Sequence, residues 1–164
     1  MTAAEFNELL QNRNLSVATA ESITAGLLAS TIASVPGASS VLKGGIISYQ
    51  EEVKTKLLSV NPEIIKIYSA ESIETTIEMV KGLANLGLNA SIYVAVTGVA
   101  SAAVNDYKLT KPIGQIYVAI LFDDQLHTFE TLLQPDSSKA SRNPIREKTV
   151  YFIFEKVMEV ISKR

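Results

Sequence analysis

The chain has 164 residues, a formal net charge of -2 at pH 7, and 47% hydrophobic and 20% charged residues. This is the composition of a globular protein, and its small net charge gives no general attraction to nucleic acid or to an anionic membrane. Cysteine is absent, which excludes disulfides, zinc–thiolate sites and cysteine nucleophiles. The N-terminal residues lack the pattern of a signal peptide, and no apolar run approaches the roughly 20 residues that span a bilayer. We therefore expect a cytoplasmic protein that binds neither nucleic acid nor membranes.

Helix and strand patterns alternate along the whole chain. Helix caps, prolines at first helical positions and apolar runs of strand length mark the elements. In the first half we expect a helix from Thr2 to about 12–14, a strand over 16–20, a helix over 23–33, a strand over 44–49, a short helix over 50–58, a helix beginning at Pro62, and a long amphipathic helix between Ser69 and Gly87. In the second half we expect a strand over 92–96 that Thr97-Gly98 breaks, a loop over 99–111, a hairpin of strands 115–122 and 126–133, and a final helix from Pro144.

This order of elements predicts the α/β fold class. A hairpin combined with strands that alternate with helices indicates a mixed β-sheet, covered by helices on both faces. No repeat, linker or low-complexity tract interrupts the pattern. We therefore expect a single three-layer α/β/α domain over residues 1–164.

Three polar residues near the first two predicted strands are candidates for catalysis. Ser22 follows the first strand at the expected start of a helix. It is either an N-cap or a nucleophile, with the helix N-terminus stabilising an oxyanion or holding a phosphate. Lys54 is either a solvated helix lysine or a general base whose pKa is lowered by burial. Tyr49 is either a sheet-edge aromatic or a group that passes its phenol proton into the same site. Together, Ser22, Tyr49 and Lys54 form a set suited to hydrolysis.

Two further pairs of residues are candidates for ligand binding. Thr97 and Gly98 end the central apolar strand, where α/β sheets place their ligands, and otherwise form a strand-ending turn. Arg142 and Arg146 lie four residues apart around the start of the last helix. They are either a phosphate clamp or ordinary surface charge. The single histidine, His127, has no partner at the spacing of a triad or a metal site, so we interpret it as structural or exposed.

Several ordered motifs resemble the CinA C-terminal domain family, the nicotinamide-mononucleotide (NMN) deamidases. The run T-A-E-S-I-T-A-G over residues 19–26 resembles the family's T-A-E-S-C-T-G-G, and P-I-G-Q-I-Y-V-A over 112–119 resembles its P-V-G-T-V-Y-I-A. V-T-G-V-A over 96–100 resembles the start of its T-G-I-A-G-P-G-G loop, and residues 142–146 match its R-x-x-I-R. Further matches are V-P-G-A-S over 35–39, G-G-I-I-S-Y over 44–49, E-V-K over 52–54 and L-L-S-V over 57–60. The resemblance covers nearly the whole chain.

The resemblance implies a reaction and roles for the candidate catalytic residues. The reaction is hydrolysis of the carboxamide of NMN to nicotinic acid mononucleotide and ammonia. In such an enzyme Ser22 would be the nucleophile, while Lys54 and Tyr49 would move its proton and protonate the leaving ammonia. This chemistry requires neither a metal nor a redox cofactor.

The resemblance also implies how the substrate is bound and how the protein assembles. Thr24, Thr97 and Gly98 would line the substrate site, and Arg142 and Arg146 would face the phosphate of the nucleotide. Family members generally form dimers or larger assemblies, so we expect a homodimer or higher homo-oligomer.

Some positions depart from the family pattern and leave two alternatives open. The residues after Gly98 read A-S-A-A-V over 100–104, where the family's glycines would stand, and Ala140-Ser141 replace its Gly-Asp. Ile23 and Ala25 also replace a family cysteine and glycine. Side chains in a glycine loop can narrow a pocket or change its path. The first alternative is therefore a catalytically weakened paralogue that binds a nucleotide or a protein without turnover. The second is an amidase that acts on another small amide.

Overall fold

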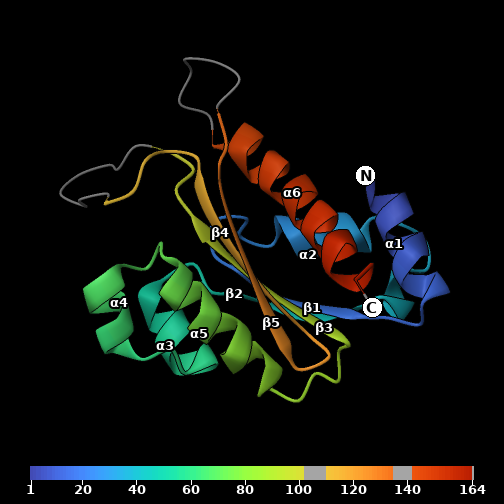
Figure 1. Cartoon of the computed structure of the whole chain (residues 1–164), viewed down its shortest axis with the longest axis horizontal. Coiled ribbons are helices and arrows are strands. Elements are labelled where there is room, and N and C mark those ends of the chain that lie inside the picture. Colours follow the sequence, from blue (N-terminus) through green and yellow to red (C-terminus); the bar gives the residue numbers. More distant parts are fainter. Residues whose placement is uncertain (102–109, 135–141, 164) are drawn as a thin grey trace.

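A five-stranded mixed β-sheet organises the protein (Figure 1). The structure is a computed structural model, and it describes residues 1–101, 110–134 and 142–163. The strands are β1 (Val17–Glu21), β2 (Leu42–Ile47), β3 (Ile92–Gly98), β4 (Gln115–Phe122) and β5 (Gln125–Leu132), in the spatial order β2-β1-β3-β4-β5. β1 pairs in parallel with β2 and β3, whereas β4 is antiparallel to both β3 and β5. The predicted α/β class with a mixed sheet is confirmed.

Helices cover both faces of this sheet. They are α1 (Ala3–Asn12), α2 (Leu27–Ala33), α3 (Glu51–Leu58), α4 (Pro62–Tyr68), α5 (Ile73–Ala84) and α6 (Asn143–Ile161), with a short 3₁₀ turn at Ala38–Ser40. Helices α1, α2 and α6 lie on one face, and α3, α4 and α5 on the other (Figure 1). The three layers that the sequence predicts are therefore present.

The two faces of the sheet are packed differently. Toward α1, α2 and α6 the strands present large apolar side chains, including Ile92, Val94 and Ile120. Toward α5 they present mainly alanines, such as Ala20 and Ala95. Small side chains let a helix approach a sheet closely, and α3 and α5 also approach each other closely. A Cβ on Gly82 of α5 would lie 1.8 Å from the carbonyl oxygen of Leu58 in α3. From this layer, Lys54 of α3 contacts the residues that follow β1 and β2.

Several predicted elements match the structure closely. Thr2 caps α1 in a capping box with Glu5, and Pro62 stands in the first turn of α4. The last helix carries its apolar residues on one buried side, as predicted. The turn between β4 and β5 uses Asp123 and Asp124 at φ +49° and +58°, the left-handed conformation that suits a tight hairpin.

Three predicted boundaries are wrong. The helix expected over 23–33 begins only at Leu27, so five residues separate it from β1. The strand expected to break at Thr97-Gly98 continues through both residues, which pair with β4. The strand expected over 44–49 is β2 at Leu42–Ile47, so it ends two residues before Tyr49. Most of the loop expected over 99–111 lies outside the described residues.

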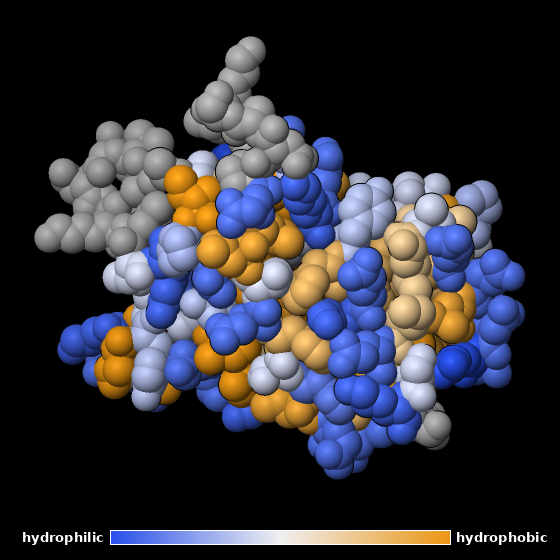
Figure 2. All heavy atoms as spheres, turned by 45° about the horizontal axis from the view of Figure 1, so that its top comes forward, coloured by the Kyte–Doolittle hydropathy of each residue, from blue (hydrophilic) through white to orange (hydrophobic). Residues whose placement is uncertain are grey.

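The surface mixes polar and apolar side chains. On the face shown in Figure 2, hydrophobic residues form separate groups among hydrophilic ones. Within the described part of the chain, no helix is both long and apolar enough to cross a membrane.

Candidate active site

Ser22 lies in a tight turn directly after β1. Its N–H donates to the Val96 carbonyl of β3 at 3.0 Å, which continues the parallel pairing by one residue. Its carbonyl accepts the Ala25 N–H at 3.1 Å. Because strand side chains alternate, Ser22 points to the same side as Ala20, toward α3 and α5. The expectation that Ser22 stands at a helix start is therefore wrong, and the N-terminus of α2 is instead occupied by the carboxylate of Glu21.

Lys54 reaches Ser22 from the middle of α3. Its Nζ lies 3.0 Å from Ser22 Oγ, and it donates to the carbonyl oxygens of Ser48 at 2.6 Å and Tyr49 at 3.3 Å. The side chain is buried, with 1% of its surface exposed. Burial lowers the pKa of the Lys54 ammonium from 10.5 to about 8, against the opposing effect of the Glu71 and Glu51 carboxylates. The hypothesis of a solvated helix lysine is therefore wrong, and the geometry is that of a serine beside an activated amine.

Tyr49 and Arg142 meet at the exposed side of this pair. The Arg142 guanidinium donates to the Tyr49 hydroxyl at 2.9 Å and to Ser101 Oγ at 3.0 Å. These bonds connect the start of α6 with the end of β2 and with the residues after β3. Tyr49 is 48% exposed, while its backbone carbonyl contacts Lys54. Arg142 is thus linked through Tyr49 to the lysine that contacts Ser22.

Arg146 and Thr24 form a second link between α6 and the Ser22 turn. An Arg146 guanidinium N–H donates to the Thr24 carbonyl at 2.7 Å, and another donates to Asn143 Oδ1 at 3.1 Å. Two groups here lack a hydrogen-bond partner among the described residues, namely Arg146 Nε and the Thr24 hydroxyl, and both are buried. The structure therefore places Arg146 inside the wall of the site, holding the turn, and Arg142 nearer to solvent.

Thr97 and Gly98 lie beside Ser22 on β3. The Thr97 hydroxyl lies 2.8 Å from that of Thr76, which donates to the Ser72 carbonyl at 2.6 Å. Since a hydroxyl has one proton, Thr97 is the donor to Thr76, and this bond ties β3 to α5. Gly98 has a packing role, because a Cβ there would lie 2.5 Å from the Gln115 carbonyl oxygen of β4. Both residues thus fix the backbone next to Ser22.

A separate hollow of about 450 Å³ opens beside α4. Its lining includes Glu51, Tyr68, Glu74 and Lys111, but none of the residues predicted to form the site. In the parts of the chain that the structure describes, no group of three or more His, Asp or Glu side chains could hold a metal ion.

Comparisons with known proteins identify the family of the chain. The sequence profile of the CinA C-terminal domain matches residues 1–161. The chain belongs to the CinA C-terminal domain family. A CinA-like protein of Petrotoga mobilis is 32% identical over 157 residues, covering 96% of this chain but 37% of its own length. The chain thus spans just over a third of that relative. The protein MG115 homolog of Mycoplasma pneumoniae is 34% identical and is matched over 99% of both chains.

Solved structures show the same fold. A CinA superfamily protein from Klebsiella pneumoniae aligns over the full length of both chains with a TM-score of 0.87 at 24% identity. A competence/damage inducible protein from Agrobacterium tumefaciens aligns with a TM-score of 0.85 at 27% identity, over 96% of this chain and 92% of its own. These neighbours support the layered fold, and the Ser22–Lys54 geometry comes from this chain itself.

Proposed function

We propose that this protein is a serine amidohydrolase that converts NMN to nicotinic acid mononucleotide and ammonia. The observation that supports it best is the 3.0 Å contact between Ser22 Oγ and the buried Lys54 Nζ. The resemblance of the motifs to NMN deamidases suggests the substrate. The hydrogen bonds of Lys54 suggest the roles of the residues.

The hydrogen bonds of Lys54 orient its amine as a base. A neutral amine has two N–H donors and one lone pair. The carbonyls of Ser48 and Tyr49 accept the two protons, which leaves the lone pair directed at the Ser22 hydroxyl. With a pKa of about 8, roughly one Lys54 in ten is neutral at pH 7. Among the described residues, no carboxylate forms an ion pair with this amine.

The reaction follows from this pair in two stages. Ser22 Oγ bonds to the carboxamide carbon while its proton moves to Lys54, and the resulting ammonium then protonates the amide nitrogen. The C–N bond breaks, ammonia leaves, and an ester to Ser22 remains. Water next gives a proton to Lys54 and attacks the ester, which releases the carboxylic acid and restores Ser22. The part of Tyr49 in this proton transfer stays a prediction, and Arg142, which donates to its hydroxyl, is proposed to contact the phosphate of the nucleotide.

The test is ammonia release from NMN by the purified protein and by two variants. We expect Ser22→Ala to abolish release, because the nucleophile is removed. Ser16→Ala, which alters a buried serine directly before β1, should retain it. Release that persists undiminished in Ser22→Ala would exclude Ser22 as nucleophile. No release from the unaltered protein, with NMN still raising its melting temperature, would favour the weakened paralogue. Release from another small amide alone would favour the second alternative.

Three other expectations stay predictions. They are the nucleotide substrate itself, assembly into a homodimer or larger homo-oligomer, and a cytoplasmic location. The glycine-poor positions 102–104, which motivate the weakened paralogue, lie outside the described residues.

A further inference from the structure

The carboxylate of Glu21 caps helix α2 from the end of β1. A helix leaves its first backbone N–H groups without partners inside the helix. Here the N–H groups of Gly26, Leu28 and Ala29 donate to the Glu21 carboxylate at 2.9, 3.0 and 2.9 Å. Gly26, at the N-cap position, has no side chain that could do this. The charged side chain of Glu21 therefore replaces the usual local cap and occupies the positive end of the helix.

Neighbouring residues complete the surroundings of this buried carboxylate. Thr19 Oγ1 donates to Glu21 Oε1 at 3.1 Å. Gly45 of β2 leaves room for that hydroxyl, because a Cβ at this position would lie 2.4 Å from Thr19 Oγ1. Glu21 is 1% exposed, and no described lysine or arginine lies within ion-pair distance of it. Hydrogen bonds alone thus compensate for the lost hydration of the charge. Thr19, Glu21 and Gly45 belong to the sequence motifs over 19–26 and 44–49, but the proposed reaction assigns no role to these three residues.

The capped turn is the one that carries Ser22. Glu21 and Ser22 are consecutive, so their side chains point to opposite faces of the sheet. The backbone then turns through Ala25 and Gly26, at φ +48° and +91°. A left-handed conformation at an alanine is unfavourable and persists only where the surroundings hold it. The bond from Gly26 to Glu21 closes this turn back onto β1.

We propose that Glu21 is a positioning residue, whose carboxylate holds the turn over residues 22–26 so that Ser22 Oγ stays within reach of Lys54 Nζ. Its kinetic consequence rests on the proposed amidohydrolase function, but its structural consequence does not. In Glu21→Gln, one acceptor oxygen becomes a donor and the charge is lost. At least one of the three N–H groups then loses its partner, and the turn loosens.

The experiment compares Glu21→Gln with Glu159→Gln, an exposed carboxylate on α6. Hydrogen exchange of the Gly26, Leu28 and Ala29 amides should speed up in Glu21→Gln, while the amides in the middle of α6 stay protected. Per folded molecule, kcat for NMN should fall about 100-fold with KM changed less than threefold, since a small displacement of a reacting group has this effect. Glu159→Gln should change neither quantity.

Each outcome supports or overturns the proposal. Unchanged exchange at the three amides would overturn it, as would an unchanged kcat in an active enzyme. If the unaltered protein does not hydrolyse NMN, the proposed function fails. The NMR titration of Lys54 then replaces the kinetic measurement. Its midpoint should rise from about 8 toward 10.5 in Glu21→Gln as water enters, and an unmoved midpoint would overturn the positioning role.

If Glu21→Gln does not fold, Thr19→Val removes one hydrogen bond and should lower kcat several-fold, or shift the same titration in an inactive protein. No change would again overturn the proposal.

Discussion

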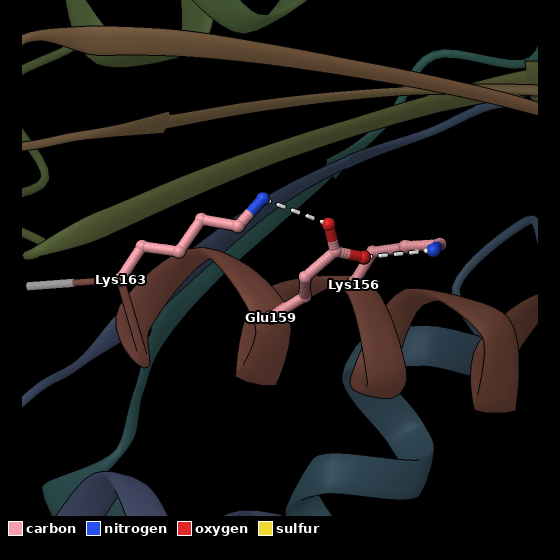
Figure 3. A network of polar contacts seen from close by, with 3 residues as sticks. All are labelled: Lys156, Glu159 and Lys163. Carbon is pink, nitrogen blue, oxygen red and sulfur yellow. Dashed lines mark hydrogen bonds and ion pairs between the residues drawn. The ribbon is translucent and has the colours of Figure 1, made fainter.

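Two lysines on helices show how differently the same side chain can be used. Lys54 of α3 is buried against two carbonyls and the Ser22 hydroxyl, with no described carboxylate within ion-pair distance. Lys156 of α6 donates to Glu159 at 2.8 Å, and Lys163 donates to the same carboxylate at 2.9 Å (Figure 3). The Lys156 ammonium also lies 5.1 Å from the centre of the Phe129 ring. Lys54 is thus held by carbonyl oxygens and a hydroxyl, and Lys156 by a carboxylate.

The difference arises from solvation and charge. Burial removes water from Lys54 and lowers its pKa to about 8. In the surface cluster, the group whose pKa is shifted is the carboxyl of Glu159. Hydrogen bonds from Lys156 and Lys163 lower the pKa of the Glu159 carboxyl to about 2, in a place where water and salt screen the charges. The pKa of the buried lysine is therefore lowered, whereas in the surface cluster it is the pKa of the carboxyl that is lowered.

The largest expected effect is on activity when the buried lysine is replaced. Lys54→Met keeps a similar side-chain volume but removes the base, so ammonia release from NMN should fall at least about 1,000-fold. Lys156→Met, the surface counterpart, should release ammonia within twofold of the unaltered rate. Equal losses in the two variants would mean that the comparison reflects folding and not catalysis.

The next largest effect is expected in the dependence of kcat/KM on pH. Only neutral Lys54 can accept the Ser22 proton, so kcat/KM should rise about tenfold per unit below pH 8 and level off above it. The profile is measured by ammonia release at fixed ionic strength. A flat profile between pH 6 and 8 would remove Lys54 from the role of base.

The smallest expected effect is on stability, which Lys54→Met should raise although it lowers activity. A folded pKa of about 8 against 10.5 in the unfolded chain means that the buried ammonium destabilises the fold by about 3 kcal/mol below pH 8. Lys54→Met should therefore be more stable at pH 7 by about 1–3 kcal/mol, after its lost hydrogen bonds are subtracted. This advantage should disappear between pH 8 and 10.5. Urea unfolding at several pH values measures it, and a less stable variant at pH 7 would contradict the account.

The sequence predicts the layers well because the signals are local. The hairpin turn at Asp123-Asp124 and the apolar side of α6 are fixed by residues within a few positions of each other. The start of α2 is predicted wrongly, because the group that caps it, the Glu21 carboxylate, lies at the end of β1 and not directly before the helix.

The site depends on contacts between residues that are far apart in the sequence, and their spacing does not predict those contacts. Lys54 meets Ser22 across 32 positions because β1 and β2 are parallel neighbours and α3 packs closely on their ends. The family motifs suggested the two residues, but not which carbonyls hold the amine. Glu21 was missed as a functional residue, although a charged residue at the end of an apolar run is a usable signal of a buried, hydrogen-bonded carboxylate.

The titration of the Lys54 side chain tests the central claim most directly. In the protein labelled with ¹³C at the lysine ε-carbons, the Lys54 resonance is assigned by its loss in Lys54→Met and followed from pH 6 to 11. We predict a midpoint near 8 for Lys54. A midpoint near 10.5 would show an ammonium that keeps its proton at neutral pH, and would contradict its role as the base for Ser22.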